Sequence, residues 1–403
     1  MKKSNGIIKQ IFKDYFKEFW QNKNDKFPEQ MREHLFKEVL KMINCGEFAL
    51  GFIAYICMQC LEKINIGFSC KSRFCNRCGK KYISDWVEKQ VRRILDVPHR
   101  HCIFTIPKEF RKYFYWNRKS LKDLQDMAYQ VIEEYINNVN GKNRAAFDKK
   151  KRIKKGGAIW QCGMISVVHT FGRSLGFNPH IHALVPELKR KNNRIVDFHY
   201  FEYKYIRKTW QYKLTRYMIK KQPEMRSEYG SLFKIYPHGF YVHVKPRMRS
   251  ARWCARYIGR YLARPAIAEY RIISYAGKMV HFWYIDHETA KRVHEIITAQ
   301  EFIGKLIMHI PPKRFKMVRR YGVYAGSIQQ KMKTYFSLIK YIKSNYKLKQ
   351  VTLKQCYEIK DKRLTWRDMI IKNFSKDPLR CKNCGRKMEL FQIWHPEYGY
   401  LLK

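Results

Sequence analysis

The chain has few acidic residues, no long hydrophobic run and no internal repeat, and these absences exclude several classes of protein. Its 403 residues hold 33 Asp and Glu against 83 Lys and Arg, so the formal net charge is +50 at pH 7. No apolar stretch reaches the roughly 20 residues that span a bilayer, and no cleavable secretory segment is recognisable. We therefore expect a cytoplasmic, reducing location with no membrane partner. The sequence does not specify an oligomeric state.

The excess of positive charge indicates a partner rich in phosphate. Basic proteins bind nucleic acids by neutralising phosphates and releasing counterions. Ribosomal and membrane-surface proteins share this sign of charge, so charge alone gives only the class of partner, which we expect to be DNA. Aromatic residues make up 15% of the chain and are interleaved with the basic ones. Some of them suit stacking on the bases of single strands.

Two histidines stand in a segment with the character of a β-hairpin. Residues 162–171 are rich in β-branched side chains, and the run 180–185 is apolar apart from its histidines. Side chains two apart project from the same face of a strand. His180 and His182 should therefore point to one site, while Ile181 faces a core on the other side.

Paired imidazoles on one strand suit a divalent metal ion. Across the hairpin, His169 is the expected third ligand, with the side-chain oxygen of Gln161 as an alternative. Because phosphoryl chemistry on DNA favours hard divalent ions, we expect magnesium or manganese, although imidazole suits other ions as well. An isolated pair of this kind also fits two buried histidines.

A helix is expected over residues 248–264, ended by Pro265. Tyr257 and Tyr261 lie four residues apart on it, between an apolar stripe and an arginine-rich stripe, so both phenols can address one site. Tyrosines packed in a core are the alternative. The nearby arginines and the upstream histidines favour chemistry on phosphate. The arginines expected to contact DNA are Arg252, Arg256, Arg260 and Arg264.

A phenol needs help to attack phosphorus because its pKa is near 10. A divalent ion can polarise a non-bridging phosphate oxygen and orient the scissile bond. The histidines and tyrosines together therefore predict metal-assisted attack of tyrosine on the DNA backbone.

These residues resemble the rolling-circle insertion-sequence transposases, which belong to the HUH class with paired catalytic tyrosines. The segments that carry the resemblance are 170–185, 257–265, 285–289, 301–313 and 321–322. The resemblance implies a transposase that cleaves and rejoins single DNA strands at the ends of its own mobile element. One tyrosine would form a 5′-phosphotyrosyl link and release a 3′-hydroxyl. The other would carry out a second cleavage or transfer.

Two other functions share parts of this pattern. A replication initiator or conjugative relaxase of the HUH class would use the same histidine and tyrosine chemistry. A catalytically inactive, zinc-dependent DNA-binding protein would keep the cysteines and the charge. The cysteine modules and the downstream segments favour the transposase.

The amino-terminal quarter predicts a zinc module. Two CxxC pairs, Cys57/Cys60 and Cys75/Cys78, have a spacing close to that of a zinc ribbon, in which four thiolates close one tetrahedral site. Cysteines used as small apolar residues or in disulfides are the alternative. We expect this module to hold Arg73 and Arg77 against DNA.

Two further pairs of cysteines leave the number of zinc ions open. Cys45 and Cys70 belong to the same cluster, and either a second zinc recruits them together with His99 or His101, or they are spare. Near the carboxyl end, Cys381 and Cys384 form a half site. His395 is a candidate third ligand there.

The order of the expected elements predicts an α+β fold. A palm-like antiparallel HUH sheet with helices should follow a zinc-ribbon-like module and precede a carboxy-terminal extension. The expected domains are residues 1–97 (helices and zinc module), 98–276 (catalytic domain) and 277–403 (basic extension with a CxxC knuckle).

Overall fold

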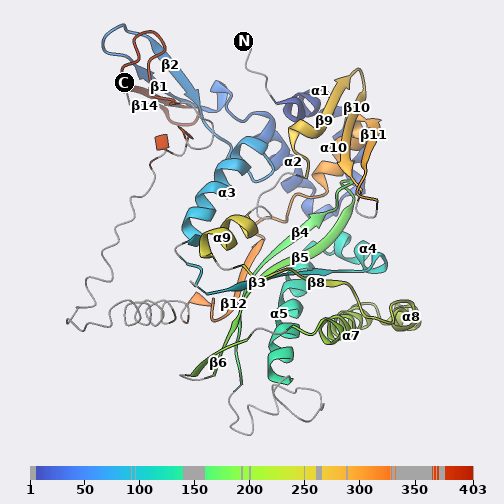
Figure 1. Ribbon diagram of the computed structural model, residues 1–403. Coiled ribbons are helices and arrows are strands. Elements are labelled where there is room, and N and C mark those ends of the chain that lie inside the picture. Colours follow the sequence, from blue (N-terminus) through green and yellow to red (C-terminus); the bar gives the residue numbers. More distant parts are fainter. Residues whose placement is uncertain are drawn as a thin grey trace, which may run out of the picture.

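Helices and antiparallel sheets alternate along the chain, which confirms the predicted α+β class (Figure 1). The computed structural model describes residues 6–402 apart from 92, 96, 139–158, 192–193, 199–200, 249, 260–265, 287–288, 327, 329–331, 333–364, 366, 369 and 372–376.

A five-stranded antiparallel sheet forms the centre of the molecule. Its two long strands, β4 and β5, form the predicted hairpin and are the middle of the sheet. In spatial order the strands are β12 (Val318–Gly322), β4 (Gly163–Phe171), β5 (Phe177–Pro186), β3 (His99–Thr105) and β8 (Val242–Val244). The edge strand β12 thus comes from the part of the sequence expected to form the carboxy-terminal extension.

The two faces of the central sheet are covered by different helices. The side chains of Ile181, Ala183 and Val185 belong to a large core beneath α4 (Lys108–Trp116), α5 (Leu121–Asn138) and α7 (Tyr203–Lys221). The alternate residues face the other way, where Leu184 packs in a second core with α3 (Asn76–Val91) and α9 (Ala251–Gly259). His180 and His182 therefore share the face of α9.

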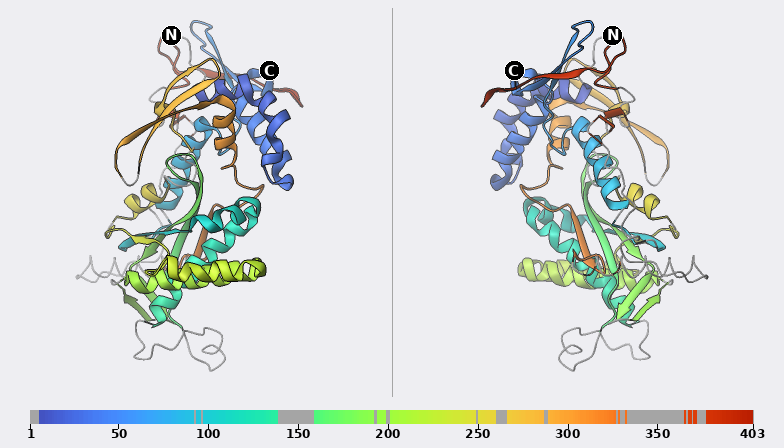
Figure 2. Two further views of the ribbon diagram at one scale, coloured as in Figure 1. Left: turned by 90° about the vertical axis from the view of Figure 1, so that its right-hand side faces the viewer. Right: turned by 90° about the vertical axis from the view of Figure 1, so that its left-hand side faces the viewer.

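A second body lies at one end of this sheet (Figure 2). Its aromatic core, which includes Phe12, Phe282 and Phe302, joins amino-terminal helices to a three-stranded sheet. Thr298 begins the last helix of this body with a capping box formed with Glu301. The elements are α1 (Ile7–Lys23), α2 (Glu29–Ile43), β9 (Ile272–Ala276), β10 (Met279–Ile285), β11 (Arg292–Thr298) and α10 (Ala299–Ile307).

A hairpin from the amino-terminal quarter and the carboxy-terminal hairpin meet in a small four-stranded sheet (Figure 1). The amino-terminal hairpin supplies β1 and β2, and the carboxy-terminal hairpin supplies β13 and β14, with β1 pairing directly with β13. The strands are β1 (Phe52–Ile56), β2 (Lys63–Gly67), β13 (Glu389–His395) and β14 (Gly399–Leu402). The peripheral elements α8 (Arg226–Ile235), β6 (Leu188–Lys191) and β7 (Arg194–Asp197) complete the fold.

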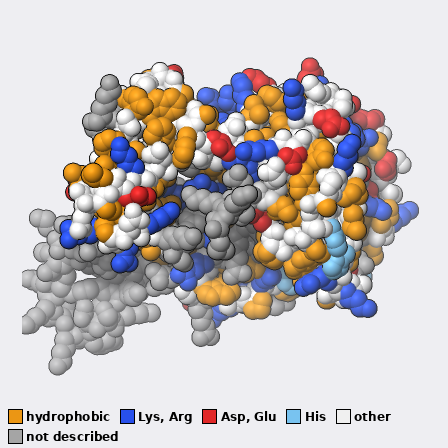
Figure 3. Space-filling view, turned by 90° about the horizontal axis from the view of Figure 1, so that it is seen from above, with side chains coloured by type: hydrophobic (Ala, Val, Ile, Leu, Met, Phe, Trp, Pro, Cys, Tyr) orange, Lys and Arg blue, Asp and Glu red, His pale blue; other side chains and the backbone are white. Residues whose placement is uncertain are grey.

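On the face seen from above (Figure 3), basic side chains are dispersed rather than gathered in one patch. On the face that carries the small sheet, lysine and arginine side chains lie among exposed apolar groups (Figure 3). Within the described ranges, no helix has the length and apolar character needed to cross a bilayer.

Candidate active site and metal centres

Three histidines converge on the β4–β5 hairpin. His169 lies directly opposite His180 in the antiparallel register, and His182 follows on the same face of β5. One imidazole nitrogen from each lies within 4.8 Å of the others. His169, the predicted third ligand, is thus brought to the predicted pair. The alternative ligand Gln161 pairs with Arg190 before β4 begins and is not a member of this group.

Hydrogen bonds orient two of these rings. The Nδ1–H of His180 donates to the carbonyl oxygen of Asn178 at 2.7 Å, so Nε2 carries the lone pair and lies 3.2 Å from Nδ1 of His169. The Nδ1 of His182 lies 3.0 Å from Nε2 of His101. Metal-binding histidines are typically oriented through their second ring nitrogen in this way. The donor set therefore fits a divalent ion.

Burial keeps the histidines in the form that binds metals. It lowers the pKa of His180 and lowers that of His182 further, with neighbouring imidazoles acting in the same direction on His182. A neutral imidazole is the form that ligates a metal ion. Both side chains are therefore neutral at physiological pH.

His101 belongs to this site and was not predicted there. It lies on β3, fully buried, and its pKa is lowered to about 3, mainly by burial and then by the charge of Lys245. The sequence offered His99 and His101 as ligands for a second zinc. Instead, His99 hydrogen-bonds to the hydroxyl of Tyr324, and His101 contacts His182. The pairing of β3 with β5, which local patterns do not reveal, creates this contact.

Tyr257 lies on α9, above the same face of the sheet. Its ring is 7% exposed, stacks on Trp253 and meets the edge of His101, with centroid distances of 5.5 and 4.8 Å. The ammonium nitrogen of Lys245 lies 5.5 Å from the ring centroid. The second predicted tyrosine, Tyr261, lies outside the described residues, as do Arg260 and Arg264.

The remaining predicted DNA-binding arginines lie on α9, on α3 and just before α3. Arg252 and Arg256 belong to α9, where Arg256 is exposed. Arg77 is exposed on α3. Arg73 donates to the hydroxyl of Tyr82 at 3.0 Å and lies over its ring. Because α3 packs on α9, the exposed Arg77 and Arg256 lie on neighbouring helices.

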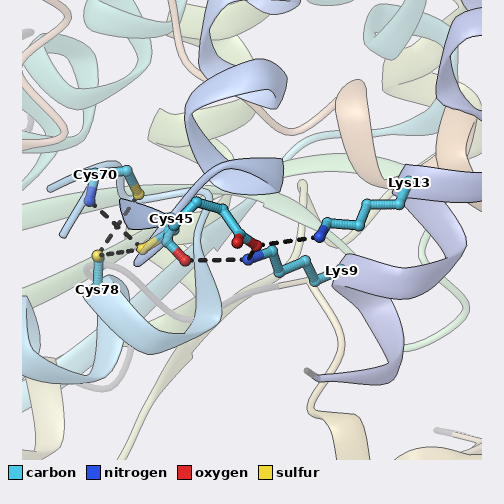
Figure 4. Close-up of polar contacts among 6 residues, drawn as sticks. Lys9, Lys13, Cys45, Cys70 and Cys78 are labelled. Atoms are coloured by element: carbon cyan, nitrogen blue, oxygen red, sulfur yellow. Dashed lines mark hydrogen bonds and ion pairs between the residues drawn. The ribbon is translucent and has the colours of Figure 1, made fainter. Parts of the chain in front are cut away.

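Four thiols of the amino-terminal region form one compact group. Cys45, Cys70, Cys75 and Cys78 offer sulfur atoms within 4.8 Å of one another, and Cys78 Sγ lies 3.6 Å from the Sγ of both Cys45 and Cys70. In a tetrahedral site with Zn–S bonds of about 2.3 Å, sulfurs stand roughly 3.8 Å apart. The ammonium group of Lys9 donates a hydrogen bond to the carbonyl oxygen of Cys45 and so stabilises the backbone beside this group (Figure 4).

This grouping corrects the pairing expected from the sequence. Cys57 and Cys60 do not share a site with Cys75 and Cys78 but lie with Cys381 and Cys384, again within 4.8 Å of one another. Cys45 and Cys70, considered spare or in need of histidine partners, instead complete the group of Cys75. The carboxy-terminal knuckle is completed by thiols, and His395 is not a member of its group.

Comparisons with known families match both modules. The family model described as “Transposase zinc-binding domain” matches residues 11–106, and the model described as “Putative transposase” matches residues 163–332. The first range contains the group of Cys45, and the second contains the three histidines and Tyr257. Zinc binding is thus supported for the amino-terminal module.

Two curated relatives match over most of their length. A transposase for insertion sequence element IS801 from Pseudomonas savastanoi pv. phaseolicola is 24% identical over 374 residues, covering 89% of this chain and 83% of the relative. “Putative transposase y4qJ” from Sinorhizobium fredii is 24% identical over 302 residues, covering 69% of this chain and 71% of the relative. No solved structure matches the chain significantly.

Proposed function

Because the chain belongs to the rolling-circle insertion-sequence transposases with an amino-terminal zinc-binding domain, we propose that it cleaves and rejoins single DNA strands by tyrosine attack. DNA is the substrate of a transposase. The proposal adds that the attack forms a 5′-phosphotyrosyl intermediate and that the strands are those at the ends of its own mobile element.

One observation carries this proposal. Tyr257 and the three histidines lie on the same face of the central sheet, and His101 contacts both Tyr257 and His182. This contact supports the proposal because it links the proposed nucleophile to the proposed metal ligands, which come from separate parts of the chain. This is the arrangement that phosphoryl transfer requires of a tyrosine, because the phenol alone is a weak nucleophile.

In a cleavage by Tyr257, the tyrosine oxygen attacks a backbone phosphorus and loses its proton. The bond from phosphorus to the 3′-oxygen breaks, and that oxygen takes up a proton, which leaves a 3′-hydroxyl and a phosphate ester on tyrosine. In the reverse sense, a 3′-hydroxyl attacks this ester and the phenol leaves with a proton regained. The number of phosphoester bonds is unchanged in each step, so no high-energy cofactor is needed.

The chain's own residues prepare this attack. The three imidazoles would hold a divalent ion, magnesium or manganese, which supplies positive charge to polarise a non-bridging phosphate oxygen. Lys245, beside the Tyr257 ring, and the exposed Arg256 offer cations for the phosphates on either side. Trp253, which is 52% exposed and stacks on Tyr257, offers a flat surface to a base of the single strand.

Tyr261 would supply the second nucleophile. It follows Tyr257 by four residues, which corresponds to about one helical turn. Two nucleophiles allow one strand to remain bound while another is cut. We propose that Arg252, Arg260 and Arg264 bind phosphates beside this pair, and that Arg73 and Arg77 bind DNA next to the group of Cys45.

The experiment is a cleavage assay on a labelled single-stranded oligonucleotide that carries an end of the element. The full chain is incubated with manganese, denatured and separated by electrophoresis. We expect a labelled protein band that survives denaturation, together with a fragment ending in a 3′-hydroxyl. Retarded DNA in a native gel without any such band would contradict the tyrosine mechanism and indicate binding alone.

A further inference from the structure

Four thiols from opposite ends of the chain converge between β1, β2 and β13. Cys57 Sγ lies 3.4 Å from Cys384 Sγ, and Cys60 Sγ lies 3.4 Å from Cys381 Sγ and 3.8 Å from Cys384 Sγ. We propose that these cysteines bind a second zinc ion, which fastens the carboxy-terminal hairpin to the amino-terminal hairpin. The site is separate from the group of Cys45 and from the catalytic histidines.

The sulfur separations distinguish a metal site from disulfides. A disulfide holds its two sulfurs at about 2.05 Å. Four thiolates around one zinc ion, with bonds of about 2.3 Å, stand roughly 3.8 Å apart. The observed separations of 3.4 to 3.8 Å match the second case. A set of four thiolates is also the donor set that soft metal ions prefer over magnesium or calcium.

The first knuckle, residues 57–62, is a tight turn that contains two of these cysteines. The N–H of Cys57 donates to the carbonyl oxygen of Glu62 at 2.9 Å, and the N–H of Leu61 donates to the carbonyl oxygen of Cys57 at 2.9 Å. Leu61 has a φ of +56°, which a leucine rarely adopts, yet the residue is 67% exposed. Packing of the leucine side chain therefore does not account for the strained backbone. The strain is explained by the tight turn, which directs the two thiols toward each other.

The second knuckle repeats this pattern residue for residue. The N–H of Cys381 donates to the carbonyl oxygen of Arg386 at 2.8 Å, and the N–H of Gly385 donates to the carbonyl oxygen of Cys381 at 3.0 Å. Gly385 has a φ of +73°, in the position that corresponds to Leu61. Two copies of one turn, with their thiols facing each other, form the zinc-ribbon arrangement. The second knuckle, however, follows the first by 321 positions.

The small sheet has too little apolar core to hold the two hairpins together by itself. Its buried hydrophobic cluster consists of Cys57, Cys381 and Met388, with Tyr55 and Ile64 partly buried against it. Sheets of this size depend on a metal or a disulfide to offset the loss of chain entropy. Zinc binding would therefore decide whether β13 pairs with β1, and so whether the two ends of the chain stay joined.

The test is the zinc content of the full chain, purified under reducing conditions and measured by mass spectrometry of the metal. We expect two zinc ions per chain for the wild type and one for Cys381→Ser/Cys384→Ser. The control Cys254→Ser removes a buried thiol outside both groups and should retain two. One ion in the wild type, or two in the double variant, would overturn the proposal.

A second measurement covers the case in which the double variant fails to fold and loses both ions. The wild-type chain is oxidised with zinc still bound, using diamide, which accepts the two electrons released by each pair of thiolates and takes two protons from water as the ion leaves. Peptide mapping should then find disulfides between the 57–60 and 381–384 segments. Disulfides between the 57–60 and 75–78 segments would refute the shared site and restore the pairing suggested by local spacing.

Discussion

The imidazole of His101 lies edge-on against the ring of Tyr257, with 4.8 Å between the ring centroids. The same imidazole contacts Nδ1 of His182 through its Nε2. One buried side chain on β3 therefore contacts both the proposed nucleophile and a proposed metal ligand. A substitution that changes the shape or the hydrogen bonding of His101 should therefore affect both Tyr257 and His182.

His101→Phe should weaken cleavage without unfolding the protein. Phenylalanine retains an aromatic ring beside Tyr257 but removes the nitrogen that orients His182. Loss of such an orienting contact typically costs 10-fold to 100-fold in metal affinity or activity. We expect the manganese concentration for half-maximal cleavage to rise by about this factor. His243→Ala, which alters the neighbouring strand β8, serves as the control. If both variants raised the required manganese concentration equally, His101 would have no special role in orienting His182.

His180→Ala combined with His182→Ala should abolish cleavage and leave DNA binding in place. The two rings are the proposed ligands on one face of β5, while the opposite face of that strand packs in the main core. The fold should therefore survive, as judged by circular dichroism. Cleavage by this variant, or by the wild type after thorough removal of divalent ions, is incompatible with the proposed site.

Gly322→Ala should destabilise the protein by on the order of 2–4 kcal/mol. Gly322 has a φ of +55°, and a Cβ added there would lie 1.7 Å from the carbonyl oxygen of Cys162. Gly277→Ala is a matched control because its φ is +57° and nothing lies within 4 Å of the added Cβ. It should cost about 1 kcal/mol. If urea unfolding showed that both variants lose the same free energy of unfolding, β12 would not pack against β4 as described.

The stability of the protein should depend on the protonation of His309. Burial lowers the pKa of His309 to about 3 from an ordinary value of 6.5, while its ring nitrogens bond to Thr170 and to the carbonyl oxygen of Leu175. Between these pH values the unfolded chain binds a proton that the folded chain does not. The free energy of unfolding should therefore fall as the pH falls below about 6.5, by at most about 1.4 kcal/mol per pH unit from this group.

His309→Gln tests this dependence, because glutamine does not titrate. Urea unfolding at pH 7.5 and 5.5 should give a smaller loss of stability on acidification for the variant than for the wild type. Identical losses would show that His309 does not titrate in this range on unfolding.

The histidine site could be predicted from the sequence because its geometry is local. His180 and His182 are two residues apart on a strand, so their side chains share one face. A short turn places His169 on the neighbouring strand, opposite His180. His101 could not be predicted, since its place depends on the pairing of β3 with β5 across some 80 residues of chain; the contacting residues are 81 positions apart.

The cysteine groups also could not be predicted in full, because their composition depends on contacts between distant parts of the chain. Each CxxC pair predicts a turn that presents two thiols, and that prediction concerns only a few residues. Which pairs combine depends on how distant strands meet. The nearest pair in sequence, Cys75/Cys78, lies at the start of α3 and contacts Cys45 instead. Proximity in sequence therefore favoured the wrong partner for Cys57 and Cys60.

The most direct test of the account is the identity of the residue that becomes linked to DNA. After cleavage of a labelled single strand, the adduct is digested and sequenced by mass spectrometry, with Tyr257→Phe/Tyr261→Phe as the comparison. We predict a nucleotide attached through its 5′-phosphate to Tyr257 or Tyr261, and no adduct in the double variant, which still binds DNA. An adduct on any other residue, or one that persists in the double variant, would contradict the account.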